Sequence, residues 1–134
     1  MSRAQTVVLA LLIMHVLLGA LCLAVARGER SVPALRGWGW GLLIYATGLM
    51  LTMQRITPAA VSLTLGNALI AWAPIITIEG VLANTNVRLN RRWAYGGLAA
   101  VIAILIYGNF FSADPRPLIN LSAPTAIAIG SFIF

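Results

Sequence analysis

The sequence predicts an all-α fold, a polytopic transmembrane helical bundle. Of its 134 residues 60% are hydrophobic and 9% are charged, whereas roughly a quarter of the residues in a soluble domain are charged. The apolar residues gather into runs of about 20, the helix length that crosses a bilayer core. Because unpaired backbone groups are costly in lipid, these runs are expected to be helices. Together they make residues 1–134 a single transmembrane domain.

The first predicted span covers about residues 4–26 and contains few polar side chains, among them His15. A cleaved signal peptide is the competing interpretation, but the hydrophobic region of such a peptide is only about 7 to 15 residues long. A polar connection follows, in which Gly28 and Pro33 interrupt the helical pattern. The first run is therefore expected to remain in the protein as a membrane helix.

The second and third spans are predicted at about 37–54 and 58–83. Thr57 is a plausible helix N-cap, and Pro58 suits the first helical position. The connection between these spans is very short, which favours an antiparallel hairpin with Arg55 at the membrane surface.

The third run is longer than a span needs and contains Pro74, so a tilted or kinked helix is expected. A fourth span is predicted at about 93–111, and a fifth apolar run covers 118–134. That last run has no basic residue to anchor its far end, and a chain terminus within the bilayer would bury a carboxylate. We therefore expect four complete spans plus a fifth that is cut, in the N-terminal part of a longer protein.

The net charge of +6 comes from nine arginines, and six of them lie in the stretches 27–36 and 88–92. Each stretch is wedged between apolar runs, so a nucleic-acid-binding surface is excluded. Basic residues concentrate in cytoplasmic connections of membrane proteins. The sequence thus predicts an integral membrane protein with these stretches in the cytoplasm and the N-terminus outside. Trp38, Trp40 and Trp93 lie beside the arginines, as interfacial aromatic residues do.

No catalytic constellation is present, because the chain has one histidine, one cysteine, Cys22, and no lysine. The sequence therefore predicts neither an enzyme nor a cofactor or metal site in this chain. Polar side chains at membrane depth are nevertheless costly and mark either function or helix packing.

Four such residues are candidates for polar locks between helices or for ligand contacts. His15 and Asn67 are expected to form interhelical hydrogen bonds, although a histidine there could also bind a metal or relay a proton. Glu79 is expected near the cytoplasmic boundary, in a salt bridge with Arg36, Arg88 or Arg91, with proton coupling as the alternative. Arg55 could contact an anionic lipid headgroup or the carboxylate of an external ligand.

Gly37, Gly41 and Gly48 fall on one face of the second predicted helix, which indicates close helix packing. The stripe does not say whether the partner is another span or a second copy of the chain, so a homodimer is possible.

A series of residues resembles the N-terminal membrane region of bacterial diguanylate cyclases. It covers residues 27–92, about half of the chain, and it consists of Trp38-x-x-Gly41, Gly48, Arg55, Pro58, Asn67-x-Leu69 and Glu79-Gly80 ahead of an arginine-rich segment. The resemblance implies a sensory or anchoring module in the bacterial inner membrane. Such a module binds an unidentified small molecule or senses the bilayer, and it is coupled to a cytoplasmic enzyme that makes cyclic di-GMP.

The GGDEF sequence of that enzyme is absent from these residues, and proteins of this type usually have six or more spans. A longer parent protein would account for both differences. The alternative interpretation is a small multi-span transporter, in which Glu79 or His15 is the proton-coupled group. The expected partners are membrane lipids and an unknown small-molecule ligand, with no nucleic acid.

Overall fold

The computed structural model is all-helical in the part of the chain that it describes, and this part contains no strand. The described residues are 3–28, 32–53, 58–85 and 87–111. The four helices are α1 (Arg3–Gly28), α2 (Pro33–Met53), α3 (Ala59–Leu82) and α4 (Arg91–Phe110). The predicted fifth run at 118–134 lies outside the described residues. The prediction of an all-α chain is thus confirmed, whereas four complete spans plus a fifth are not supported.

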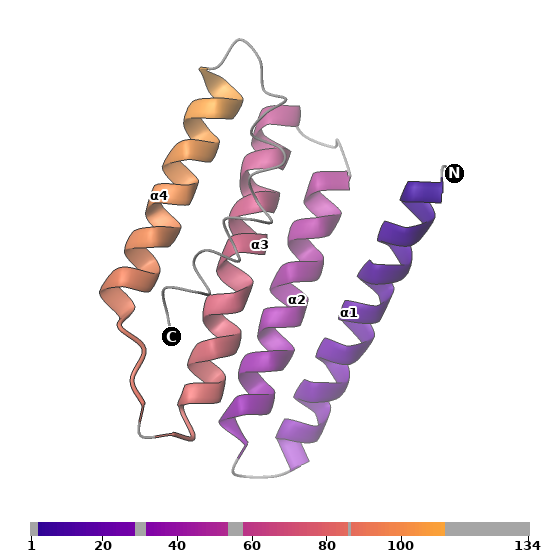
Figure 1. The fold of residues 1–134 in the computed structure, drawn as a ribbon. Coiled ribbons are helices and arrows are strands. Elements are labelled where there is room, and N and C mark those ends of the chain that lie inside the picture. Colours follow the sequence, from indigo (N-terminus) through magenta and orange to yellow (C-terminus); the bar gives the residue numbers. More distant parts are fainter. Residues whose placement is uncertain (1–2, 29–31, 54–57, 86, 112–134) are drawn as a thin grey trace.

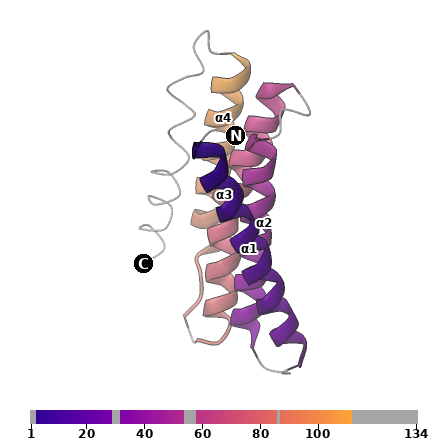
Figure 2. The same cartoon turned by 90° about the vertical axis from the view of Figure 1, so that its right-hand side faces the viewer.

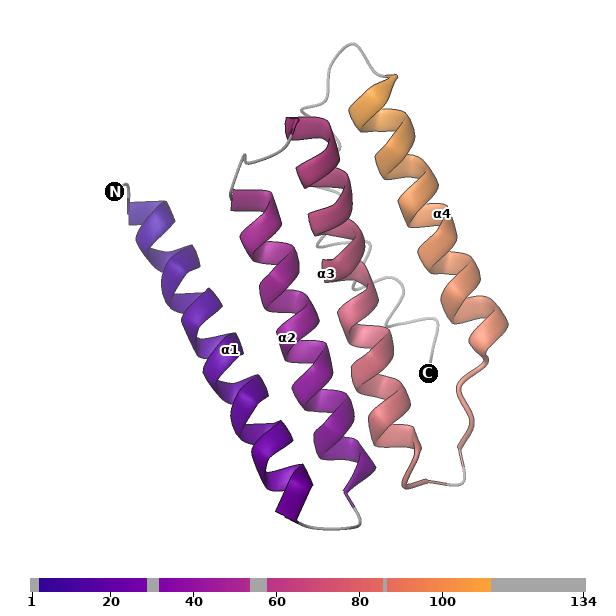
Figure 3. The same cartoon turned by 180° about the vertical axis from the view of Figure 1, so that it is seen from behind.

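The helices lie side by side in chain order, each antiparallel to the next (Figure 1; Figure 3 from behind). The main contacts are α1 with α2, α2 with α3 and α3 with α4. Seen from the side the helices overlap (Figure 2), so they form a layer. Helices α1 and α4 occupy opposite edges of this layer.

Three of the helices are long and apolar enough to cross a membrane: α1 from Thr6 onward, α3 and α4. The edge helix α1 exposes ten large hydrophobic side chains, including Ile13, Met14 and Leu17. A contiguous apolar surface of this kind is untenable in water. These apolar helices therefore suggest an integral membrane protein, as predicted.

Helix α2 was predicted to be the second span, but it is not among the three helices that are apolar enough to cross a membrane. Its first turns contain Arg36 and are rich in glycine and tryptophan. Its central position explains the difference. Since α1 and α3 flank it on both sides, much of α2 faces protein, and its buried residues are small: Gly37, Gly39, Gly41, Ala46 and Gly48.

Two helices begin earlier than the apolar pattern indicated. Helix α2 starts at Pro33 rather than residue 37, because proline has the backbone angle of a first helical residue and needs no N–H partner there. Helix α4 starts at Arg91 rather than residue 93. Pro58 is the N-cap of α3, not its first helical residue, and Thr57 lies outside the described part. Apolarity locates the membrane portion of a helix and underestimates its polar ends.

The closest packing in the structure is between α2 and α3. A Cβ atom added to Gly37 would lie 2.5 Å from the Cα atom of Gly80, and one added to Gly48 would lie 2.7 Å from the carbonyl oxygen of Gly66. Between these pairs, a Cβ on Gly41 would collide with the hydroxyl of Thr77. We call these five glycines, together with Thr77, the glycine seam. Its contacts run in opposite order along the two helices, as antiparallel packing requires.

Helix α1 packs on the opposite side of α2 through a second, smaller contact. A Cβ atom added to Gly39 would lie 2.6 Å from the side chain of Leu23, and one added to Gly19 would lie 3.0 Å from the side chain of Leu43. Cys22, one turn after Gly19, is also buried. The two sides of α2 are therefore both lined by small residues.

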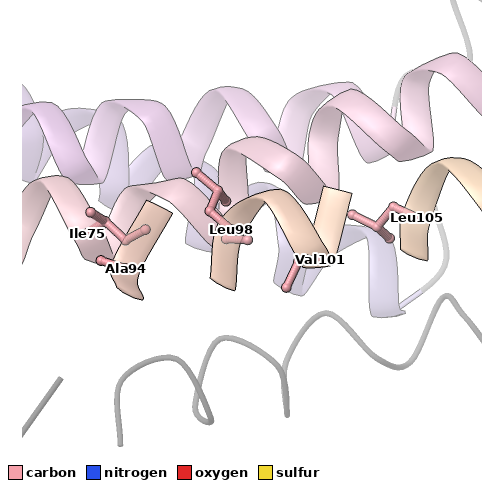
Figure 4. Close-up of a cluster of buried hydrophobic side chains, with 6 residues drawn as sticks. Ile75, Ala94, Leu98, Val101 and Leu105 are labelled. Atoms are coloured by element: carbon pink, nitrogen blue, oxygen red, sulfur yellow. The ribbon is translucent and has the colours of Figure 1, made fainter. Parts of the chain in front are cut away.

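Helix α4 packs on α3 through an apolar strip (Figure 4). The strip on α4 consists of Ala94, Leu98, Val101 and Leu105, whose spacing of four, three and four residues places them on one face of a helix. Ile75 of α3, which is fully buried, lies beside Ala94 at one end of this strip. Side chains fill this interface, whereas backbone approaches backbone in the glycine seam.

Replacement of Gly37 by alanine is predicted to destabilise the protein, because the new methyl group meets the backbone of Gly80 rather than a flexible side chain. The expected loss is about 1 to 3 kcal/mol, the usual cost of overpacking. The measurement is thermal unfolding of the purified protein in detergent, followed by circular dichroism.

Gly96→Ala in α4 is the matched control, because a Cβ atom at Gly96 would have no neighbour within 4 Å. This variant should gain about 0.5 to 1 kcal/mol from the higher helix propensity of alanine. Equal stability of the two variants would show that the seam is not tightly packed.

Candidate functional site

Glu79 lies near the C-terminal end of α3 and faces the beginning of α4. Its carboxylate is 3.0 Å from Nε of Arg91 and 3.3 Å from the hydroxyl of Tyr95, which donates a hydrogen bond to Oε2. Arg91 and Tyr95 are four residues apart and so share one face of α4. Of the three arginines proposed as partners from the sequence, the structure brings Arg91 to Glu79.

The pair between Glu79 and Arg91 is a close charge contact rather than a directed hydrogen bond. Oε1 of Glu79 is buried and accepts no hydrogen bond from the described residues, although Nε of Arg91 is near. The Arg91 side chain is 76% exposed, against 22% for Glu79. Exposed ion pairs contribute about 0 to 1 kcal/mol to stability. Glu79 thus orients the start of α4 without binding it strongly.

A second polar contact joins the other ends of α3 and α4. Nδ2 of Asn109 donates a hydrogen bond of 3.0 Å to Oγ1 of Thr64, and that hydroxyl donates in turn to the carbonyl of Ala60 at 2.7 Å. Thr64 is 8% exposed. Its hydroxyl is therefore both donor and acceptor in a site with little access to solvent, which makes the pair a polar lock between two helices.

Asn67, the amide expected to lock helices, is buried at 6% exposure on α3. It lies one turn from Thr64, whose lock with Asn109 the sequence reasoning missed. Asn109 and Tyr95 could have been identified from the sequence, because each is a polar group within a long apolar run. Thr64 carried none, since threonine hydroxyls often bind the carbonyl of their own helix.

His15 does not form the interhelical hydrogen bond expected from the sequence. Its Nδ1 lies 2.7 Å from the carbonyl oxygen of Leu11, one turn earlier in α1, so the ring nitrogen donates within its own helix. The imidazole instead reaches α2 by stacking on Tyr45, with ring centroids 4.9 Å apart. Helix geometry explains the difference, because the carbonyl four residues earlier lies within hydrogen-bond reach of this ring nitrogen.

The glycine stripe of Gly37, Gly41 and Gly48 faces α3. Its partner is therefore another helix of the same chain, a point that the sequence left open. Gly66, Ala73 and Gly80, which are seven residues apart, would have indicated the matching face of α3. Arg55 lies outside the described residues.

An open groove lies between α3 and α4 near the Thr64–Asn109 lock. It has a volume of about 450 Å³ and is lined by Val61, Thr64, Leu65, Ile106, Phe110 and Phe111. Its accessible wall is apolar. Such a surface accommodates hydrocarbon and offers nothing that would orient a polar substrate.

Exposed aromatic side chains lie toward both ends of the layer. Trp93, at the start of α4, is 77% exposed, and Phe110 and Phe111 near its other end are 52% and 74% exposed. The 17 positions from Trp93 to Phe110 span about 26 Å of helix. This separation is close to the thickness of a bilayer core, as expected for aromatic residues at the two membrane surfaces.

The acidic, histidine and cysteine side chains of the described residues are dispersed. Within residues 3–28, 32–53, 58–85 and 87–111, no three histidine, cysteine, aspartate or glutamate side chains lie close enough to hold a metal ion. The polar groups are instead distributed as contacts between neighbouring helices. Their arrangement suits holding helices in register.

Thr64→Val is predicted to weaken the packing of α4 on α3. The substitution keeps the side-chain shape but leaves the amide of Asn109 without its acceptor. The expected loss averages about 0.6 kcal/mol and reaches about 1.7 kcal/mol at most, as for other hydrogen bonds between membrane helices. The measurement is a double-mutant cycle with Asn109→Ala, using unfolding of the purified protein by denaturing detergent.

Thr47→Val is the matched control, because the Thr47 hydroxyl is exposed and bonds only to Leu43 of its own helix. Its stability should stay within about 0.5 kcal/mol of the wild type. Additivity of Thr64→Val and Asn109→Ala in the cycle would contradict the lock.

Comparison of the chain with protein-family models, curated proteins and solved structures yields no match.

Proposed function

We propose that this chain is the membrane-embedded sensory or anchoring region of a signal-transduction protein. In this proposal the signal is passed on by a movement of α4. The observation that carries the proposal is the contrast between the two interfaces of α3. The glycine seam holds α2 and α3 with their backbones in contact. On the other side of α3, helix α4 is held by the packing of apolar side chains and by a polar contact near each end.

This contrast supports a helix that moves against a fixed hairpin. Side chains can repack in small steps, whereas a seam of backbone contacts permits almost no displacement. The Thr64–Asn109 lock and the Glu79–Arg91 pair would then define one register of α4. A ligand in the apolar groove, or a change in the bilayer around it, would favour one register over another.

The membrane placement that we propose has all four helices spanning. Although α2 is less apolar, its 21 residues extend about 31 Å, enough for the bilayer core. We further propose a bacterial inner membrane location, with the arginine-rich connections in the cytoplasm, the N-terminus outside and residues 118–134 as a fifth span. We also propose that the region binds an unknown small-molecule ligand and forms a homodimer. Arg55 would contact a lipid headgroup or this ligand.

The proposed output is synthesis of cyclic di-GMP by a cytoplasmic domain of the parent protein. It rests on the resemblance over residues 27–92 and on the absence of catalytic groups among the described side chains. In this arrangement α4, or a span that follows it, would pass the movement to the enzyme.

The test is to express the complete reading frame that contains this chain and to measure cyclic di-GMP in the cells. We expect the frame to continue beyond Phe134 into a GGDEF domain and the cyclic di-GMP level to rise severalfold. Deletion of residues 1–134 should move the remaining protein from the membrane to the soluble fraction. A stop codon directly after Phe134, or an unchanged cyclic di-GMP level, would refute the proposed output.

The second candidate function is proton-coupled transport, and one observation favours it. Oε1 of Glu79 is buried without a hydrogen bond from the described residues, so the carboxylate has an oxygen available for a proton. The Arg91 contact opposes this role, because the carboxylate is already paired with a guanidinium group.

Transport predicts that Glu79→Gln abolishes pH-dependent substrate or proton flux in proteoliposomes, with His15→Ala as the companion variant. The sensory proposal predicts that both variants show the same proton flux as the wild type. Glu79→Gln is a suitable probe because glutamine keeps the shape of the side chain and its contact with Tyr95. Loss of flux in either variant would favour the transporter.

A further inference from the structure

We propose that the arginine-rich end of the helix layer is a recognition surface for anionic phospholipid headgroups. We call it the basic rim and define it by Arg27, Arg36, Arg88, Arg91 and Arg92. The inference rests on the membrane placement in the proposed function and is independent of any cyclic di-GMP output.

The fold brings these arginines to one end of the layer from three places in the chain. Arg27 is in the last turn of α1, Arg36 is in the first turns of α2, and the others surround the start of α4. The C-terminal ends of α1 and α3 and the starts of α2 and α4 lie at the same end of the layer (Figure 1). All five side chains are exposed, so their charges are available to a partner outside the protein.

Little negative charge within the protein balances the basic rim. Glu79 is the acidic residue at this end among the described positions, and it is already paired with Arg91. Glu29 and Arg30 lie outside the described residues and have opposite charges that cancel. The rim therefore has an excess of four positive charges, five arginines against one glutamate.

Two helix N-termini increase this positive potential. Helices α2 and α4 both begin at the basic rim, and neither has an acidic residue in its first turn. The N-terminal end of a helix bears a partial positive charge and is stabilised by anions. Arg36, Arg91 and Arg92 add positive charge at those ends instead. Asn90, the N-cap of α4, makes no side-chain capping hydrogen bond. An external anion would reduce the repulsion between these positive charges. It could also accept hydrogen bonds from the uncapped backbone amides at the helix start.

The neighbouring aromatic residues indicate that this anion belongs to a lipid. Trp38, Trp40 and Trp93 are 48%, 55% and 77% exposed within the first turns of the same two helices. Exposed tryptophan beside arginine is typical of the headgroup level of a membrane. A phosphate ion would use the charges alone, whereas a phospholipid uses the charges and the aromatic surface together.

The experiment measures which lipid contacts the tryptophans. The purified protein is reconstituted into phosphatidylcholine vesicles that contain a minor fraction of brominated phosphatidylglycerol or, in parallel, brominated phosphatidylcholine. Bromine quenches tryptophan fluorescence only on contact, so the ratio of quenching gives the relative association of the two lipids. We expect severalfold preference for the anionic lipid, which is lost at high salt, where charges are screened within about 3 Å.

Variants assign the preference to the rim. The quadruple variant Arg27→Gln, Arg36→Gln, Arg88→Gln, Arg92→Gln should lose it, and the same four changes to lysine should retain it. Arg91 is left in place because it pairs with Glu79. An arginine near an anionic surface contributes up to about fivefold, so Arg92→Gln alone should lower the preference measurably. Helical content, followed by circular dichroism, checks that each variant is folded.

Arg55→Gln is the matched control, because residue 55 joins the ends of α2 and α3 that lie away from the rim. A lipid that binds Arg55 would therefore be too far from Trp38, Trp40 and Trp93 to quench them. It makes the same chemical change and should leave the preference intact. Equal quenching by the two brominated lipids would overturn the proposal, as would an equal effect of Arg55→Gln and Arg92→Gln. Displacement of brominated phosphatidylglycerol by inorganic phosphate at constant ionic strength would assign the rim to free phosphate instead.

Discussion

The contact between the backbones of α2 and α3 is the constraint on which the rest of the structure depends. At the Gly37–Gly80 and Gly48–Gly66 contacts no side chain larger than hydrogen fits without displacing backbone. In a bilayer, apolar side chains gain little by leaving lipid for protein, so close packing and hydrogen bonds hold helices together. The glycine seam provides that packing at the centre of the layer. The other two helices are added on either side of it.

The open layer follows from the same physical situation. In water, the ten large apolar side chains exposed on α1 would drive the chain to close around them. Lipid removes this driving force, because hydrocarbon tails solvate leucine as well as protein does. Each edge helix therefore needs only enough specific contact to fix its position: the stacking of His15 on Tyr45 for α1, and the Thr64–Asn109 lock for α4.

The sequence was sufficient for the helical class, the membrane environment and the alternating direction of the helices, because each depends on apolar runs and their short connections. The sequence was a poorer guide to which side chains contact each other between helices. The stripe of Gly37, Gly41 and Gly48 revealed one half of the seam. The other half could not be predicted, because the sequence does not show which helix packs against the stripe. His15 illustrates the limit, since the sequence cannot reveal whether an imidazole binds its own helix or the next. The Thr64–Asn109 lock was missed because its acceptor, Thr64, gave no signal: a threonine hydroxyl often bonds to the carbonyl of its own helix.

The distribution of polar contacts also bears on how such a layer could transmit a change. Its polar contacts between α3 and α4 lie near opposite ends, with the apolar strip between them. The Glu79–Arg91 pair is partly exposed and weakened by salt, whereas the Thr64–Asn109 lock is shielded. The end of α4 at the basic rim is thus the more easily released, and its charge environment depends on the lipids around it. Lipid composition and helix position are thereby linked through Arg91, which belongs both to the rim and to the α3–α4 interface.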